Sequence, residues 1–342
     1  MSSLAPSIWG LPSLRQFLSD VEATVWDGGS VLLLDESTPS GVTEQLLQRF
    51  QDSYTANELS PAQGITPLLS IVDLVGCDKN LAAVVAADNH VVIVDGRKLP
   101  MADLAEWKVF LHRFSLARAP LEGGLAVLFL APKGFSVEGQ TRVEWAGRLK
   151  RIDAIIWAEF HVPSGRSTLF QDLAVNLATE LCGWRLDLIA DLVTQREEDI
   201  VHPYGWMSRN LDRASSFEGS FGTRTFSCPL HLSSSLQGKE CDQRIWKAQL
   251  ASIFPWIEEH RIRIVERYKK FLRIDDRLRQ LKVFEVENIE LGALTYQLRQ
   301  HVPRNEFEHM EALASMRNDL AHRKPIDAQK FKRALEISDT LR

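Results

Sequence analysis

The stretch HVVIVDG, residues 90–96, decides the fold class of the first part of this 342-residue chain. A short apolar run that ends in Asp-Gly is typical of a strand buried on both faces of a sheet. Three further runs have the same character, namely VLLLD at 31–35, AAVVAA at 82–87 and GLAVLFLAP at 124–132. These four runs are predicted to be strands of one sheet.

Helical periodicity separates the apolar runs. The segment ESTPSGVTEQLLQRFQ (36–51) predicts a helix with Thr38 or Ser40 as its N-cap, and MADLAEWKVFLHRFSLAR (101–118) predicts another. Strands that alternate with helices indicate a mostly parallel sheet. We therefore predict an α/β domain over residues 1–150.

The remainder of the chain is predicted to be helical. Residues 151–210 have helical periodicity, whereas residues 211–242 are rich in Ser and Gly and are predicted to be a linker or long loop. Residues 243–342 contain four helical segments with short breaks, the pattern of an antiparallel bundle. The expected fold class is thus α/β plus all-α.

Composition favours a protein without membrane segments. The chain has 45% hydrophobic and 25% charged residues, no apolar run near 18 residues, and no basic leader followed by an apolar core. Its four cysteines are scattered, as in proteins of reducing compartments. Cys228, His231 and Cys241 supply three zinc-type ligands where a structural site needs four. We expect a cytoplasmic protein with no bound metal and no membrane association.

Positive charge is concentrated in the last third of the chain. The net charge is −5, yet residues 242–342 contain 20 Lys and Arg against 16 Asp and Glu. Residues 261–282 alone contain nine Lys and Arg against three acids. A basic region on an acidic body indicates an anionic partner, although a solvated helix face has the same composition.

The stretch MRNDLAHRKP, residues 316–325, gathers polar side chains on a predicted helix. Arg317 and His322 lie about 140° apart around a helix, while Asn318 lies one turn below His322. All three can border one groove, beside an apolar face formed by Leu313, Met316 and Leu320. The alternative is a solvated basic helix end, which the helix dipole also favours.

This stretch resembles the Arg-x(4–6)-His motif of the HEPN superfamily, over roughly residues 243–342. A polar residue directly after the arginine is typical of the ribonucleases of that superfamily, and Asn318 fits this form. The preceding segment IELGALTYQLRQ (289–300) adds to the resemblance, with Glu290 expected to point into the bundle. Some HEPN domains serve only for binding or dimerisation, so that alternative stays open.

The resemblance implies metal-independent RNA cleavage in a groove made by two such domains, usually of a homodimer. It implies His322 as general base or acid and Arg317 as the ligand of the scissile phosphate. Asn318 would orient the histidine or the phosphate. The ribose 2′-hydroxyl would be the nucleophile, and the product would be a cyclic phosphate.

Residues 1–150 resemble a P-loop NTPase core of the STAND or AAA type. HVVIVDG is similar to a Walker B strand, which implies that Asp95 lies near nucleotide-bound magnesium. The P-loop position after VLLL reads DESTPSGVTEQLL, with one glycine and no Gly-Lys-Ser/Thr. The rival match GFSVEGQT (134–141) has Gln140 where the lysine belongs. We therefore predict a degenerate P-loop that does not hydrolyse ATP.

Together the two resemblances imply an RNA-cleaving effector of a prokaryotic antiviral or conflict system, governed by a nucleotide-binding-like sensing domain and needing no cofactor. The implied partners are RNA, a second copy of the chain and other proteins of the defence system. One alternative is a non-catalytic scaffold or dimerisation subunit with a pseudo-NTPase domain. Another is a live nucleotide switch that uses Asp95.

Overall fold

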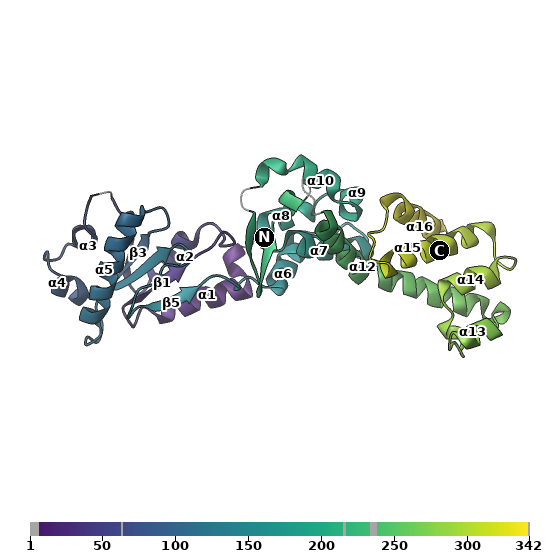
Figure 1. Cartoon of the computed structure of the whole chain (residues 1–342), viewed down its shortest axis with the longest axis horizontal. Helices are drawn as coiled ribbons and strands as arrows, with labels where there is room; N and C mark the ends of the chain where they lie inside the picture. The colour runs from purple at the N-terminus through teal and green to yellow at the C-terminus, as the bar shows by residue number, and fades with distance from the viewer. Residues whose placement is uncertain (1–6, 63, 215–216, 233–237, 341–342) are drawn as a thin grey trace. The chain divides into compact units, whose positions relative to one another are not determined.

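The computed structural model describes residues 7–62, 64–214, 217–232 and 238–340 (Figure 1). The chain divides into two compact units. The first comprises Met1–Asp153 and Glu218–Phe226, and the second comprises Ala154–Phe217 and Ser227–Arg342. Within the described ranges, no helix is both long enough and apolar enough to cross a membrane.

A five-stranded parallel sheet in the order β2-β3-β4-β1-β5 forms the centre of the first unit. Its strands are β1 (Gly29–Leu33), β2 (Thr55–Leu59), β3 (His90–Asp95), β4 (Ala126–Ala131) and β5 (Thr141–Glu144). Every residue of β1 and β4 is buried, as are the four central residues of β3. The prediction of a mixed α/β chain with a mostly parallel sheet is confirmed.

The two edge strands are missing from the sequence-based prediction. β2 reads TANEL and has no buried residue, and β5 reads TRVE with only Val143 buried. An edge strand has a partner on one side only, so its side chains can be polar and its apolar signal is weak. Pairing with β3 and β1, rather than hydrophobicity, makes these segments strands.

The prediction of a strand at AAVVAA is wrong, because these residues lie in and beside the helix α4 (Leu81–Ala86). Asn80 caps this helix by accepting the Ala83 N–H at 2.8 Å. Val84 and Val85 are buried. The apolar run therefore signalled burial, and the alanines and the N-cap decided for a helix.

Further helices flank the sheet: α1 (Pro12–Ala23), α2 (Val42–Phe50), α3 (Pro67–Val75) and α5 (Met101–Arg118) (Figure 1). The α5 helix has the predicted bounds, and its Trp107 ring lies 5.4 Å from the Phe129 ring of β4. The predicted N-caps of α2 are wrong. Gly41 occupies that position with a φ of 82°, a left-handed conformation that favours glycine.

The order of the strands identifies one special edge of the sheet. From β1 the chain continues through α2 to β2 on one side, whereas from β4 it continues to β5 on the other side. In open α/β sheets, ligands bind at the carboxyl ends of strands where the connections diverge in this way. This edge carries the loops after β1, β3 and β4, including Asp95.

The second unit is helical. Its longer helices are α6 (Arg151–His161), α7 (Thr168–Cys182), α8 (Leu186–Leu192), α12 (Gly238–Tyr268), α14 (Leu291–Leu298), α15 (Arg304–Ala321) and α16 (Ala328–Thr340). Its shorter helices are α9 (Glu197–Val201), α10 (Tyr204–Arg209), α11 (Pro229–Leu232) and α13 (Asp276–Gln280). α12 packs along α7, and α15 contacts α14, α16 and α12.

The stretch 211–242 contains regular structure among its described residues. A two-stranded sheet is formed by β6 (Glu218–Phe221) and β7 (Arg224–Ser227), and α11 and the start of α12 follow. Single turns of 3-10 helix lie at Ile8–Gly10, Leu211–Arg213, Lys269–Phe271 and Val286–Asn288.

Candidate functional site

The MRNDLAH stretch forms the last turns of α15. The predicted apolar face is confirmed, since Leu313, Met316 and Leu320 are all buried. The helix ends in a left-handed residue, Arg323, with a φ of 58°. Its N–H donates to the Leu320 carbonyl at 3.1 Å, and the Lys324 N–H donates to the Asp319 carbonyl at 2.9 Å. These two bonds form a Schellman motif, which fixes the position of the helix end.

Side chains of α12 hold the helix end and the turn that follows it. The Trp246 indole N–H donates to the Leu320 carbonyl at 2.7 Å. Gln249, which is fully buried, accepts the Ile326 N–H at 2.6 Å and donates to the Val201 carbonyl at 3.0 Å. The backbone around His322 is thus attached to the body of the second unit.

The three predicted site residues occupy this helix end. Arg317 is half-buried, whereas Asn318 and His322 are exposed. His322 is the C-cap of α15, and its backbone N–H donates to the Asn318 carbonyl at 3.0 Å. Five residues of helix correspond to roughly 7–8 Å along the axis, so Arg317 and His322 flank a space about as large as one phosphodiester.

Glu290 lies differently from the sequence-based expectation. Its carboxylate pairs with the Arg317 guanidinium at 2.7 Å, and its side chain is 58% exposed. It therefore does not point into the bundle. Glu290 is the N-cap residue of α14, and that position brings its carboxylate to the surface beside α15. The pair uses one nitrogen of Arg317, which has five N–H donors in total.

Asp319, the acidic residue inside the motif, is bound by the next helix. Lys330 of α16 approaches its carboxylate at 2.8 Å. Because this ion pair compensates the aspartate, the charge of Asp319 is not directed at Arg317. The helix end thus presents a guanidinium, an amide and an imidazole, and these groups can bind an anion and transfer a proton.

The loop after β1, where a P-loop would lie, is closed by its own side chains. The Asp35 carboxylate accepts the N–H of Ser37 at 2.8 Å and also its hydroxyl. The N–H of Thr38 donates to the Asp35 carbonyl, and the N–H of Asp35 donates to the Thr38 hydroxyl. A P-loop directs such backbone N–H groups at phosphates. Here they are occupied within the loop.

Two tryptophans cover the same loop. The Trp145 indole donates to the Ser37 hydroxyl at 2.9 Å, and the Trp9 indole donates to the Ser40 carbonyl at 3.1 Å. Both rings are buried, and they lie 6.0 Å apart. Aromatic packing therefore fills the space before α2.

Asp95 ends β3 at the same sheet edge, but its charge is paired. Arg97 holds its carboxylate with two hydrogen bonds of 2.8 and 2.6 Å. The hydrogen bond from the Arg97 side chain keeps the pKa of Asp95 below its usual range. A magnesium ion at Asp95 would have to displace this guanidinium. The Arg two residues after the strand aspartate is visible in the sequence, but its contact with Asp95 is not.

The rival glycine loop at 134–141 leads into the strand β5, so no helix N-terminus follows it. The Gln140 amide donates to the Leu111 carbonyl of α5, and His112 contacts the Glu138 carbonyl. These contacts hold the loop on α5. The phosphate-binding part of a P-loop, a helix that begins after the glycines, is absent here.

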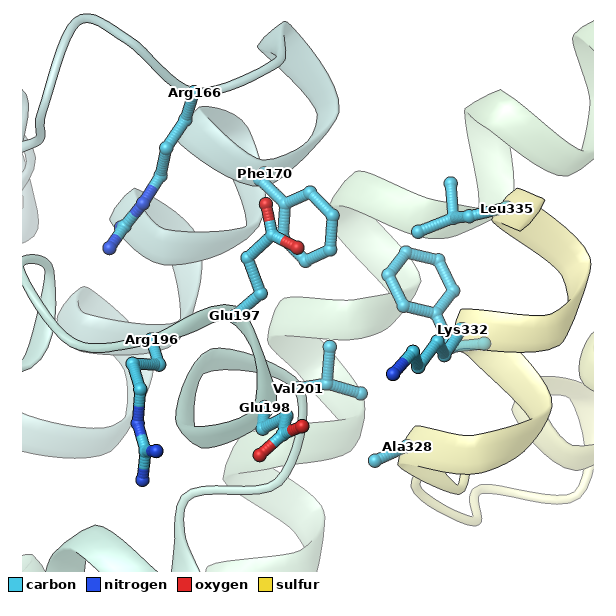
Figure 2. Close-up of a pocket in the computed structure, with 10 residues that line it drawn as sticks. Arg166, Phe170, Arg196, Glu197, Glu198, Val201, Ala328, Lys332 and Leu335 are labelled. Atoms are coloured by element: carbon cyan, nitrogen blue, oxygen red, sulfur yellow. The ribbon is translucent and has the colours of Figure 1, made fainter. Parts of the chain in front are cut away.

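A cavity of about 440 Å³ lies between α7, α9 and α16 (Figure 2). Phe170 and Phe331 pack edge to face in its floor, with ring centroids 5.6 Å apart. Figure 2 shows charged side chains of both signs around it, among them Arg196, Glu197 and Lys332. Arg166 donates to the carbonyls of Val193 and Gln195. The cavity suits an apolar group better than a phosphate, and no motif residue lines it.

The zinc-type residues do not form a metal site among the described residues, where no cluster of three or more His, Cys, Asp or Glu is placed to hold a metal. Cys228 and Cys241 are buried thiols, and Arg185 donates to the Cys228 sulfur at 3.4 Å. Burial raises the pKa of Cys241 to about 11.

Comparisons with known proteins add no identity to this geometry. No protein-family model, no curated protein and no solved structure matches the chain.

Proposed function

We propose that this chain is a metal-independent RNA-cleaving protein whose site is the end of α15. The observation that carries the proposal is the exposure of Asn318 and His322 beside Arg317 at a helix end that the surrounding protein holds firmly. None of these three side chains fills the core. A rigidly held and exposed Arg/Asn/His group is suited to bind a phosphodiester and to transfer a proton.

In the proposed reaction, His322 accepts the proton of a ribose 2′-hydroxyl as that oxygen attacks the adjacent phosphorus. The new bond joins O2′ to phosphorus, and the bond from phosphorus to O5′ breaks. The products are a 2′,3′-cyclic phosphate and a 5′-hydroxyl, which takes up one proton. Arg317 binds the non-bridging oxygens and stabilises their developing charge. Asn318 donates its amide hydrogens to the phosphate.

A second copy of the chain completes the proposed site. The reaction needs one group to accept a proton and another to donate one, and each chain contributes a single histidine at this helix end. Two α15 ends that face each other in a homodimer would provide both. This arrangement also places two guanidinium groups around one phosphate.

The first unit is proposed as a sensing domain that resembles a nucleotide-binding core but does not hydrolyse ATP. Its parallel sheet and the position of Asp95 at the carboxyl end of β3 support the resemblance. The self-bonded loop after β1 and the Asp95–Arg97 pair argue against a live nucleotide switch. We place the whole chain in a prokaryotic antiviral system, as an effector that a partner protein controls through this unit.

The test is cleavage of total RNA and tRNA by the purified full-length protein in EDTA. We expect His322→Ala and Arg317→Ala to lose at least about a hundredfold in rate, the usual contribution of a general acid–base group. The matched controls are His202→Ala, another exposed histidine of the second unit, and Arg304→Ala at the opposite end of α15. Equal activity in wild type and His322→Ala would overturn the proposal.

One observation favours a second candidate, a non-catalytic scaffold. Arg317 already has a carboxylate partner in Glu290, so the motif can serve to join α15 to α14. In that case Arg317→Ala and Glu290→Ala would lower the free energy of unfolding by similar amounts. Wild-type protein would then assemble with its partners without cleaving RNA.

A further inference from the structure

The basic run at 261–282 separates into paired and unpaired charges. Five of its nine cations form ion pairs: Arg261, Arg263, Arg267, Lys269 and Arg279. Lys270, Arg273, Arg277 and Lys282 form none with the described residues. The unpaired charges thus begin where α12 ends, and two of them border one pocket.

This pocket, of about 390 Å³, lies between the turn after α12 and the end of α14. Its lining is polar: Lys270, Phe271, Arg273, Asp275, Gln297 and His301. We define these six residues as the stacking pocket. The carboxylate of Asp275 accepts the Leu278 N–H as the N-cap of α13, so that part of its hydrogen-bonding capacity is used.

A flat pair of rings forms one wall of the stacking pocket. The His301 imidazole lies on the Phe271 ring with centroids 4.5 Å apart and planes 11° from parallel. Lys270 places its ammonium group 4.8 Å from the centroid of the Phe271 ring. Phe271 is half-buried, whereas His301 is exposed. One face of the imidazole covers the phenyl ring, and the opposite face is open to a planar group.

The geometry of the pocket is set before any ligand binds. The Arg273 backbone N–H donates to the Gln297 side-chain oxygen at 3.0 Å, and the Gln297 amide donates to the Arg273 carbonyl at 2.9 Å. This reciprocal pair fixes the backbone of Arg273 against α14. The guanidinium itself stays exposed beside the ring pair.

We infer that the stacking pocket binds single-stranded RNA, with a base on His301 and the adjoining phosphates near Lys270 and Arg273. An open aromatic face beside unpaired cations is the arrangement with which proteins bind single strands without reading sequence. Because the ligand is RNA, this inference rests on the proposed function.

The location of the pocket fits a strand that also reaches the proposed cleavage site. Gln297 and His301 are at the carboxyl end of α14, whereas Glu290, the partner of Arg317, is at its amino end. The helix is roughly 12 Å long at 1.5 Å per residue. At about 3.4 Å per stacked nucleotide, the strand spans this length with about four nucleotides. The pocket therefore holds RNA a few nucleotides away from the cleaved bond.

The experiment measures binding of a fluorescent 12-nucleotide single strand with 2′-O-methyl sugars, which cannot be cleaved, to the full-length protein in EDTA. We expect His301→Ala to weaken binding roughly tenfold, the contribution of one stacked base. His301→Phe should retain most of the affinity because it keeps a flat ring. Lys270→Ala with Arg273→Ala should reduce the salt dependence of binding by a slope of about 1.

Arg263→Ala is the matched control, since it removes a charge of the same basic run outside the pocket. It should change the affinity less than twofold. Unchanged affinity in His301→Ala would overturn the inference, as would equal binding of a free mononucleotide or of duplex RNA. RNA cleavage that depends on His322 would still support the proposed function in that case. Conversely, binding that depends on His301 without any cleavage would uphold the pocket and remove the nuclease.

Discussion

Glu290 holds the Arg317 guanidinium at 2.7 Å, so a phosphate at Arg317 meets a carboxylate already in place. The pair is partly exposed, at 31% for the Arg317 side chain and 58% for that of Glu290. Exposed ion pairs contribute little to stability because water and salt screen them. Glu290 thus acts mainly on the orientation of Arg317 and on its competition for an anion.

Glu290→Gln should strengthen RNA binding, because it removes the competing charge. We expect the dissociation constant of uncleavable RNA to fall roughly two- to fivefold, with less than about 1 kcal/mol lost from the free energy of unfolding. Titration of labelled RNA measures the first effect and urea unfolding the second. Glu311→Gln, an exposed carboxylate of α15, is the control for net charge. Weaker binding in Glu290→Gln would show that the carboxylate positions Arg317 and does not compete for it.

His309 makes the second unit sensitive to acid. It is 3% exposed, and its ring lies 5.3 Å from that of His260. Burial lowers the pKa of His309 to about 4, the charge of His260 adds to the shift, and the Ala334 backbone opposes it. The unfolded chain has the ordinary histidine pKa near 6.5, so between pH 6.5 and 4 it binds more protons than the folded chain.

The stability that neutral His309 provides is therefore complete above pH 6.5 and is lost as the pH falls toward 4. The loss is at most about 3 kcal/mol. Urea unfolding at pH 7.5, 6 and 5 measures it. His309→Leu should flatten the curve over this range, because it removes the titrating group without opening the core. An unchanged pH dependence in His309→Leu would assign the effect to other groups.

At the scale of elements, α12 determines how α15 ends. Gln249 of α12 bonds to backbone on both sides of it, at Val201 and at Ile326. One fully buried amide thus connects α9, α12 and the turn between α15 and α16. The position of His322 at the helix end depends on this connection.

Gln249→Leu should destabilise the second unit, because it leaves the Ile326 N–H and the Val201 carbonyl buried without partners. Each such group costs roughly 1–3 kcal/mol. The free energy of unfolding measures the loss, and amide hydrogen exchange should show faster exchange at Ile326. RNA cleavage should fall with it, as His322 loses its fixed position. Gln280→Leu, an exposed site of α13, is the control. Normal protection of Ile326 in Gln249→Leu would contradict this role.

The loop between β1 and α2 determines what the first unit can bind. Its N–H groups and the carboxylate of Asp95 are both engaged by neighbouring side chains. We expect calorimetry with magnesium and ATP to detect no binding. Arg97→Ala should not create binding either, because it frees Asp95 but leaves the loop closed. Binding that Asp95→Ala abolishes would restore the nucleotide switch.

At the scale of the whole molecule, the first unit is built from two parts of the chain. Glu218–Phe226 belongs with it although about sixty residues of the second unit intervene. The hydroxyls of Ser220 and Ser37 share a hydrogen bond of 2.8 Å, and the Gly222 N–H donates to the Leu149 carbonyl at 2.7 Å. The segment thus contributes bonds to the loop that would otherwise cradle a phosphate.

A site completed by a second copy makes activity depend on protein concentration. We expect the full-length protein to have the mass of a dimer in light scattering. On dilution below the dissociation constant of the dimer, the rate per chain should fall in proportion to the dimer fraction. A constant rate per chain down to monomer concentrations would show that one chain carries a complete site.

The sequence by itself determined the three central strands, the bounds of α5 and the apolar face of α15. Each depends on a periodicity that burial imposes on consecutive residues, so it is visible locally. The edge strands β2 and β5 were not predicted, and AAVVAA was assigned to the wrong element. An edge strand is defined by hydrogen bonds to a distant strand, and a short apolar run is compatible with either helix or strand.

The candidate site divides in the same way. Arg317, Asn318 and His322 are recognisable from their spacing on one helix. Only the tertiary structure brought Glu290 to Arg317, Arg97 onto the carboxylate of Asp95, and His301 onto Phe271. In two of these contacts the partners lie 27 and 30 residues apart in the chain. Packing of whole helices places such side chains together, and local sequence cannot specify which carboxylate or ring will be the neighbour.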